Sequence, residues 1–524
     1  MSPQKINRFI LTFMEVFLIT VFSAYGAPHD PDSCQQNYLP YLENELIVGL
    51  DTTVAGVDSS SIRQVNNQFG TEVAGYIKHL EIFQLSIPGI YDLDSIAQEI
   101  EALEIISFAH PNYFNDTLNS IQGSFPIGDI DRLNMEDQWA WHMLALGEAH
   151  EYSTGRGVTV AVLDGGVDYR HPQLRDCTIM RGYDYVDDDG DPFDEPGGVN
   201  HGHGTFIAGI IHLTAPEAVI MAYRVCTPSG KGNGFVLARA IMQAVDDQCD
   251  VINLSLVMHK ESQHHALESV IEYARQNDVI VVAGAGNIEL GGINIHLYPA
   301  EDPNVITVAA IDPDKKLAAF SCHGKHIDVC APGVEIYSTY IDKGNYINAW
   351  WSGTCFSASF VSGQAALIIA RNLYDSSYSL IRDIIVNTAE DIDPLNPEHE
   401  GQLGQGLINP VAALKYVDSL FPENTCFEKK SGTEDIDIRN YPDPFHIETV
   451  ISYYLADPTH VKLEIFNLLG RRVATLIDEF QPAGRYEVKW SRNDNGGKPL
   501  ASGIYFYRIK TDASITTRKI MLLK

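Results

Sequence analysis

Three short segments of the chain each place a chemically active side chain next to a turn. Asp164 follows residues 160–163, an apolar run of the buried-strand type, and His203 opens a segment of small residues, 203–209. Cys355 opens a similar segment after a glycine turn. Brought together, these groups could perform nucleophilic catalysis, because a histidine can take the proton of a thiol while a carboxylate orients the histidine. Asp, then His, then nucleophile is one of the known chain orders of such triads.

Each of the three residues also has a structural explanation. An aspartate at the end of a strand often caps the next turn, and a histidine can cap a helix. The chain has eight cysteines, whose pairing cannot be read from their spacing, so Cys355 could instead lie in a disulfide. Taken singly, the structural explanations are favoured for the Asp and the His; taken together, the segments favour a catalytic site.

The elements that must position these residues alternate between strands and helices from about residue 135. The predicted strands are the apolar, β-branched runs 158–163, 218–226, 250–256 and 279–283. The predicted helices are 235–247 and 266–276. This alternation predicts an α/β fold in which a mostly parallel sheet carries helices on both faces, with the site at the carboxyl ends of the strands.

Smaller modules flank this central domain, which we place at 135–418. Residues 40–116 have the pattern of a small α+β domain, and the polar stretch 115–130 predicts an exposed linker. A second polar linker, 422–439, leads to residues 440–524. There, period-two alternation and turn signals predict a small β-sandwich.

The first residues predict a signal peptide, 1–26. Lys5 and Arg8 precede an apolar stretch, 9–22, and small residues follow at 23–27. The apolar stretch is too short to cross a bilayer core of about 30 Å. We therefore expect export, with a retained membrane anchor as the alternative.

The chain of 524 residues is strongly acidic, with 36 Lys and Arg against 69 Asp and Glu and a formal net charge of −33. Nucleic-acid binding needs local positive charge to displace phosphate counterions, so we expect no nucleic-acid partner. The charge is uneven, because residues 441–524 hold 12 basic and 9 acidic side chains. This late change of sign indicates a separate C-terminal domain.

Further motifs make the central domain resemble the subtilase family of serine endopeptidases. They are 251–256, 285–287, 298–300, 328–333 and 404–409, in the family's order. The resemblance implies a subtilisin-like fold, polypeptide substrates and no cofactor for the chemistry. It also implies that Asp164 orients His203 and that His203 is general base and then general acid. The side-chain amide of Asn287 would donate to the oxyanion.

The chain departs from the family at two positions of the cleft. Cys355 stands where subtilases have the nucleophilic serine. A thiol at a helix N-terminus beside a histidine could act as a thiolate, but sulfur is larger than oxygen and fits poorly in a pocket shaped for a hydroxyl. Val257 replaces a glycine on the strand lining the primary specificity pocket, which puts a branched side chain where substrate backbone would approach.

Two interpretations follow. In the first, the chain is a secreted endopeptidase with the triad Asp164, His203 and Cys355. In the second, it is a catalytically impaired relative whose cleft still binds extended peptides by strand addition. The intact Asp164, His203 and Asn287 favour the enzyme, whereas Cys355 and Val257 favour the binder.

An acidic loop before His203 is a candidate structural calcium site. Residues 187–195 contain six carboxylates and a glycine. We expect ligands from Asp187, Asp189, Asp191 and Asp194, since Ca²⁺ prefers oxygen ligands and many subtilases bind calcium near this position. A solvated acidic turn without a metal is the alternative.

Both flanking modules resemble known families as well. Residues 40–116, above all 109–113, resemble the propeptide of secreted subtilases, which inhibits the site until it is cut away. Residues 440–524 resemble type IX secretion sorting domains. The implied partners are the chain's own propeptide and the type IX secretion machinery, with a membrane met only during export. The implied location is outside the cell or on its surface.

Overall fold

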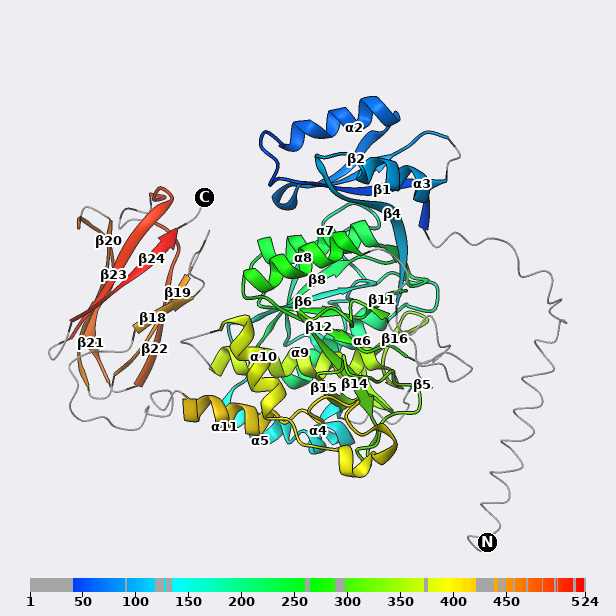
Figure 1. Cartoon of the computed structure of the whole chain (residues 1–524). Coiled ribbons are helices and arrows are strands. Elements are labelled where there is room, and N and C mark those ends of the chain that lie inside the picture. Colours follow the sequence, from blue (N-terminus) through cyan, green and yellow to red (C-terminus); the bar gives the residue numbers. More distant parts are fainter. Residues whose placement is uncertain are drawn as a thin grey trace, which may run out of the picture.

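A computed structural model describes residues 41–522 apart from several gaps. The gaps are 90–91, 118–126, 129–133, 260–263, 288–296, 372–375, 421–437, 442–444, 446–448, 456–457, 468–469, 483, 494–495, 497 and 512–514. The predicted signal peptide, Cys34, Cys426 and nearly all of the predicted linker 422–439 therefore lie outside the described residues. Within the described residues, no helix is both long and apolar enough to span a membrane. Figure 1 shows three folded parts in chain order.

The N-terminal part is a small α+β domain with an antiparallel sheet in the order β2-β3-β1-β4. Its strands are β1 (Tyr41–Leu50), β2 (Glu72–Ile77), β3 (Ile82–Ser86) and β4 (Ile106–Thr117). The helices α2 (Ile62–Phe69) and α3 (Leu93–Glu101) lie on its outer side, and the sheet lies over α7 and α8 of the central domain (Figure 1). Side chains of the two domains form one apolar core at this contact.

The central domain is built on a seven-stranded sheet in the order β15-β14-β12-β10-β6-β8-β7. Its strands are β6 (Thr159–Asp164), β7 (Thr178–Asp184), β8 (Val219–Arg224), β10 (Val251–Leu254), β12 (Ile280–Gly284), β14 (Val305–Ile311) and β15 (Val329–Pro332). Every neighbouring pair is parallel. The predicted α/β fold with a parallel sheet is therefore confirmed.

Helices cover both faces of this sheet. One face carries α6 (His203–Thr214) and α9 (Thr354–Arg371), and the other carries α7 (Gly234–Asp246) and α8 (His265–Gln276). In β6, Val160 and Val162 belong to the core shared with α6 and α9, while Ala161 and Leu163 belong to the core shared with α7 and α8. Successive side chains of a strand point to opposite faces, so a strand covered on both sides must be apolar throughout. The core of the first face also takes in α4 (Trp139–Met143), α5 (Leu146–Tyr152), α10 (Tyr378–Asn387) and α11 (Pro410–Leu420).

The start of the predicted linker 115–130 is not a linker. Strand β4 continues to Thr117 and pairs with two short strands of the central domain, β9 (Lys231–Asn233) and β11 (Leu256–His259). Asn115 is only 1% exposed. Strand β5 (Ile127–Gly128) then pairs with β17 (Asn345–Trp351), which also pairs with β16 (Ile336–Asp342). A last short strand, β13 (Leu297–Tyr298), pairs with β11.

The C-terminal part consists of two antiparallel sheets, β18-β19-β22 and β21-β20-β23-β24. The strands are β18 (Ile438–Tyr441), β19 (Thr449–Leu455), β20 (Thr459–Asn467), β21 (Arg472–Gln481), β22 (Gly484–Trp490), β23 (Gly503–Lys510) and β24 (Ile515–Leu522). In β20, Val461, Leu463 and Ile465 are buried in a core to which both sheets contribute. This is the alternation expected of a small sandwich.

Candidate active site

Asp164 is the last residue of β6, in the interior of the parallel sheet. Its buried carboxylate accepts hydrogen bonds from the backbone N–H of Gly165 (2.7 Å) and from Nδ1 of His203 (3.0 and 2.9 Å to its two oxygens). Because Nδ1 donates to the carboxylate, Nε2 is the ring nitrogen that can exchange a proton with another group. The carboxylate thereby fixes the tautomer and the orientation of the ring.

His203 is the first residue of α6, and its ring is fully buried beside Trp351 and Phe356. Its Nε2 lies 3.3 Å from Sγ of Cys355. Burial opposes protonation of the ring, but the negative charges of Asp164 and Cys355 more than offset it. The pKa of His203 therefore lies well above its ordinary value. This electrostatic balance favours the protonated, imidazolium form of the ring.

Cys355 is the second residue of α9 and carries a free thiol that is 0% exposed. The disulfide alternative for this residue is therefore wrong. The thiol lies in the first turn of α9, at the positive end of the helix dipole. The turn that leads into α9 is tight: a side chain at Gly333 would clash with Ser357, and the N–H of Gly353 donates to the carbonyl of Gly333 (2.9 Å).

Asn287 follows β12 and is anchored to the residue that precedes the thiol. Its Oδ1 accepts hydrogen bonds from the backbone N–H and from Oγ1 of Thr354, both at 3.0 Å. Fixing Oδ1 also fixes the direction of the side-chain Nδ2, the group expected to donate to an oxyanion. The backbone N–H of Cys355 lies in the first turn of α9, where it has no intrahelical partner, and is a second candidate donor.

The segment that joins the first two domains pairs with strands of the central domain through its described residues 114–117 and 127–128. Upstream, Asn115 lies opposite Gly232 of β9, and Thr117 lies opposite Leu256 of β11. Downstream, Ile127 pairs with Trp350 of β17, whose next residue, Trp351, contacts the ring of His203. The chain is therefore paired with strands of the central domain both before and after residues 118–126.

Val257 does not keep backbone away from the cleft, contrary to our expectation. It pairs with Asp116 in the antiparallel ladder between β11 and β4. Its side chain is 3% exposed and belongs to the apolar core. A branched residue is compatible with strand pairing here, because the ladder uses only its backbone groups.

The four aspartates expected to bind calcium do not converge. Asp187 is paired with Arg224, Asp189 accepts from the N–H of Asp191, and Asp191 accepts from Tyr169. Asp194 is 2% exposed and is hydrogen-bonded to residues at the start of α6. Within the part of the chain that the structure describes, no three His, Cys, Asp or Glu side chains are grouped as metal ligands. The residues do not fit a shared cation, so calcium binding by this loop stays a prediction without support from the geometry.

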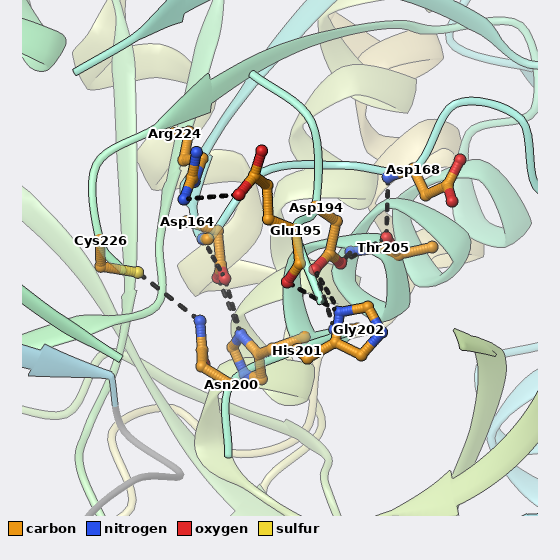
Figure 2. A network of polar contacts seen from close by, with 12 residues as sticks. Asp164, Asp168, Asp194, Glu195, Asn200, His201, Gly202, Thr205, Arg224 and Cys226 are labelled. Atoms are coloured by element: carbon orange, nitrogen blue, oxygen red, sulfur yellow. Dashed lines mark hydrogen bonds and ion pairs between the residues drawn. The ribbon is translucent and has the colours of Figure 1, made fainter. Parts of the chain in front are cut away.

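Asp194 and Arg224 instead hold this loop against the site, which the sequence did not reveal (Figure 2). Asp194 accepts hydrogen bonds from the N–H of Gly202 (3.0 Å) and from Oγ1 of Thr205 (2.6 Å), on either side of His203. Arg224, at the end of β8, pairs with Asp184 (2.8 Å), Asp187 and Glu195 (3.7 Å). The loop is thereby tied to the sheet by a guanidinium and to α6 by a carboxylate.

Replacement of Arg224 by methionine should destabilise the central domain by about 3–5 kcal/mol, because it leaves the buried Asp184 without a counter-ion. Urea-induced unfolding measures this loss. The matched control is Lys415→Met, which removes an exposed pair with Glu148 and should cost less than about 1 kcal/mol. Equal unfolding curves for both variants would contradict the structural role given to Arg224.

The sheet, the helix-borne histidine and thiol, and the Asp-His-Cys geometry define the class of α/β proteins with a subtilisin-like catalytic arrangement. The chain belongs to the subtilase family: residues 155–406 match it, and two curated relatives support the assignment. The "Thermophilic serine proteinase" of Bacillus sp. (strain AK1) is 34% identical over 312 residues, which cover 57% of this chain and 72% of the relative. Thermitase of Thermoactinomyces vulgaris is 34% identical over 279 residues, covering 51% and 92%.

The flanking domains match known families too. Residues 32–112 match the fervidolysin N-terminal prodomain, and residues 439–523 match the secretion system C-terminal sorting domain. The crystal structure of fervidolysin from Fervidobacterium pennivorans, a keratinolytic enzyme related to subtilisin, resembles this chain with a TM-score of 0.59 and 21% identity. The match covers 90% of this chain and 71% of fervidolysin, and at this identity it shows the fold alone. The chain is thus a secreted subtilase with a prodomain and a sorting domain.

Proposed function

We propose that this chain is an endopeptidase that uses Cys355 as its nucleophile. The observation that carries the proposal is the position of His203, which contacts a buried carboxylate through Nδ1 and a free thiol through Nε2. A thiolate in this position can attack the carbonyl carbon of a peptide bond. The relatives described above as a serine proteinase and as thermitase are consistent with peptide bonds as the substrate.

Each later step also has a group in place. Nδ2 of Asn287 and the N–H of Cys355 would hold the oxyanion, and the imidazolium of His203 would protonate the leaving amine as the C–N bond breaks. The remaining thioester would be hydrolysed by a water molecule that gives a proton to His203. Release of the new carboxylate restores the thiolate and imidazolium.

The first substrate that we propose is the chain itself. The segment that joins the first two domains pairs with β11 through residues 116–117 and with β17 through residues 127–128, so the segment 118–126 between them is the natural place for cleavage. The prosegment domain, which is the small α+β domain built from β1 to β4, α2 and α3, would then remain as an inhibitor until it dissociates. Further substrates would be extended polypeptides that add a strand between β9 and β11, and the type IX secretion machinery would act on residues 440–524.

One observation favours the second function, peptide binding without cleavage. The cleft already holds a strand paired on both of its edges, which is sufficient for binding and needs no chemistry. Under this alternative, Cys355 would remain an inert thiol in a closed site. The experiment below distinguishes the two functions.

Intact mass and N-terminal sequencing of the secreted protein test the proposal. We expect a new N-terminus within or shortly after 118–126, and none in the Cys355→Ala variant. A peptide electrophile should label Cys355. Cys177→Ala is the control and should be labelled as the wild type is. Cys177 lies outside the triad, and burial raises the pKa of its thiol to about 12. An uncut wild-type chain with no label on Cys355 would leave binding as the function.

A further inference from the structure

Three histidines meet where the prosegment domain contacts the central domain. His110 lies on β4 and is 2% exposed, and His264 and His265 lie at the start of α8. The ring centroids of His110 and His265 are 6.1 Å apart. A cavity of about 10 Å³ lies at this contact, lined by His110 and His264 and by apolar side chains of both domains, among them Ile47 and Leu267.

The hydrogen bonding of His110 defines it as a neutral ring. Its Nδ1 lies 2.8 Å from the carbonyl oxygen of Pro111 and can only donate to it. Its Nε2 is buried and has no hydrogen-bond partner among the described residues. A second proton would therefore sit on Nε2, away from water and without an acceptor. Burying such a charge is strongly unfavourable.

The groups around the ring do not offset that charge. His264 and His265 face it from α8 and would repel it if they were charged, and Tyr113 packs beside it on β4. The carboxylates further out are engaged elsewhere. Glu268 lies 3.1 Å from Nδ1 of His265, and Asp302 accepts a hydrogen bond from Tyr298, whose ring stacks on His264.

We propose that protonation of His110 loosens the contact between the prosegment domain and the central domain, so that mild acid favours release of the inhibitor. As a form of regulation the inference rests on the proposed peptidase function, but the response of the contact to pH needs no catalysis. Separation of the two domains would expose His110 to water, where it accepts a proton readily. Proton uptake therefore favours the separated state.

The size of the effect follows from proton linkage. Burial, with smaller contributions from His265 and His264, lowers the pKa of His110 to about 4, against about 6.5 for an exposed histidine. The group is neutral in both states at pH 8 and charged mainly in the separated state at pH 5. The equilibrium constant for separation should therefore rise about 30-fold between pH 8 and pH 5.

Hydrogen exchange in the full-length Cys355→Ala chain tests this without any cleavage. The exchange of amides in β1 and β4, corrected for intrinsic rates, should show about 30-fold more opening at pH 5 than at pH 8. His110→Leu should remove this pH response. The matched control is His79→Leu, which removes a half-exposed histidine of the same contact, paired with Asp246 at 3.4 Å, and should keep the response.

A second substitution at His110 and a measurement of peptidase activity complete the test of the proposal. If leucine disturbs docking at pH 8, His110→Asn supplies a side chain that keeps a donor and cannot titrate, and it should also abolish the response. A 30-fold response that survives both substitutions would overturn the proposal. In the self-cleaved wild-type protein, peptidase activity should appear faster at pH 5. A chain that never cleaves itself would contradict the proposed function, while hydrogen exchange would still decide the role of His110.

Discussion

Replacement of Asp164 by asparagine should slow peptide-bond cleavage by about 10⁴. The carboxylate accepts a hydrogen bond from Nδ1 of His203 and supports the positive charge of the ring. An asparagine amide can donate to Nδ1 instead, which would stabilise the tautomer that carries its proton on Nε2. The ring would lose both its correct tautomer and the charge that offsets its burial, so the imidazolium and thiolate would no longer form together.

Self-cleavage of the full-length chain gives the measurement, because its rate is intramolecular and does not depend on substrate affinity. Asp168→Asn is the matched control: Asp168 is a buried aspartate of the same segment, and its carboxylate pairs with Arg170. That variant should cleave itself at a rate close to that of the wild type. A rate for Asp164→Asn within tenfold of the wild type would refute the role given to the carboxylate.

The parts of the site that the sequence predicts are those that each element places by itself. A fully apolar run requires burial on both faces, so a polar residue at its end, Asp164, must lie at the carboxyl ends of the parallel strands. His203 directly follows a glycine, Cys355 lies two residues after one, and both lie at the start of a helix rich in small residues, which can pack closely on the sheet. Because all three signals are local, the sequence could predict that these residues lie together, as their contacts in the structure show.

The parts that the sequence does not predict depend on partners far away in the chain. Residues 115–117 are polar and look like a linker, but the edges of β9 and β11 convert them into strand. The acidic loop has the composition of a calcium site, yet Arg224 supplies a positive charge from the end of β8. Nε2 of His110 is buried at the contact with another domain, without a hydrogen-bond partner among the described residues. Composition cannot predict these three features, since each depends on residues that the fold brings together from distant parts of the chain.

Replacement of Cys355 by serine should raise the rate of amide hydrolysis, by about 10² if the misfit of sulfur amounts to about 1 Å. Sulfur is larger than oxygen and its bond to carbon is longer, so we expect the thiol to fit poorly in a site shaped for a hydroxyl. The relative ease with which the groups leave the tetrahedral intermediate also favours the serine variant. In a tetrahedral intermediate formed on sulfur, the thiolate leaves more readily than an amine, so the intermediate tends to return to substrate. An alkoxide leaves less readily, and the intermediate more often goes on to expel the amine.

The pH dependence of the two proteins should differ in sign, which separates this effect from a change in stability. In the mechanism that we propose, a thiolate of Cys355 works beside a protonated His203, whose pKa is well above its ordinary value because the charges of Asp164 and Cys355 outweigh burial. Activity of the wild type should therefore fall as pH rises through that pKa. A serine needs the neutral ring as a base, so the activity of Cys355→Ser should rise as pH rises. Steady-state cleavage of a peptide amide, measured as a function of pH for both proteins, tests the expected fall for the wild type and the expected rise for Cys355→Ser. A folded serine variant that remains inactive at every pH would show that the obstacle to catalysis lies elsewhere in the cleft.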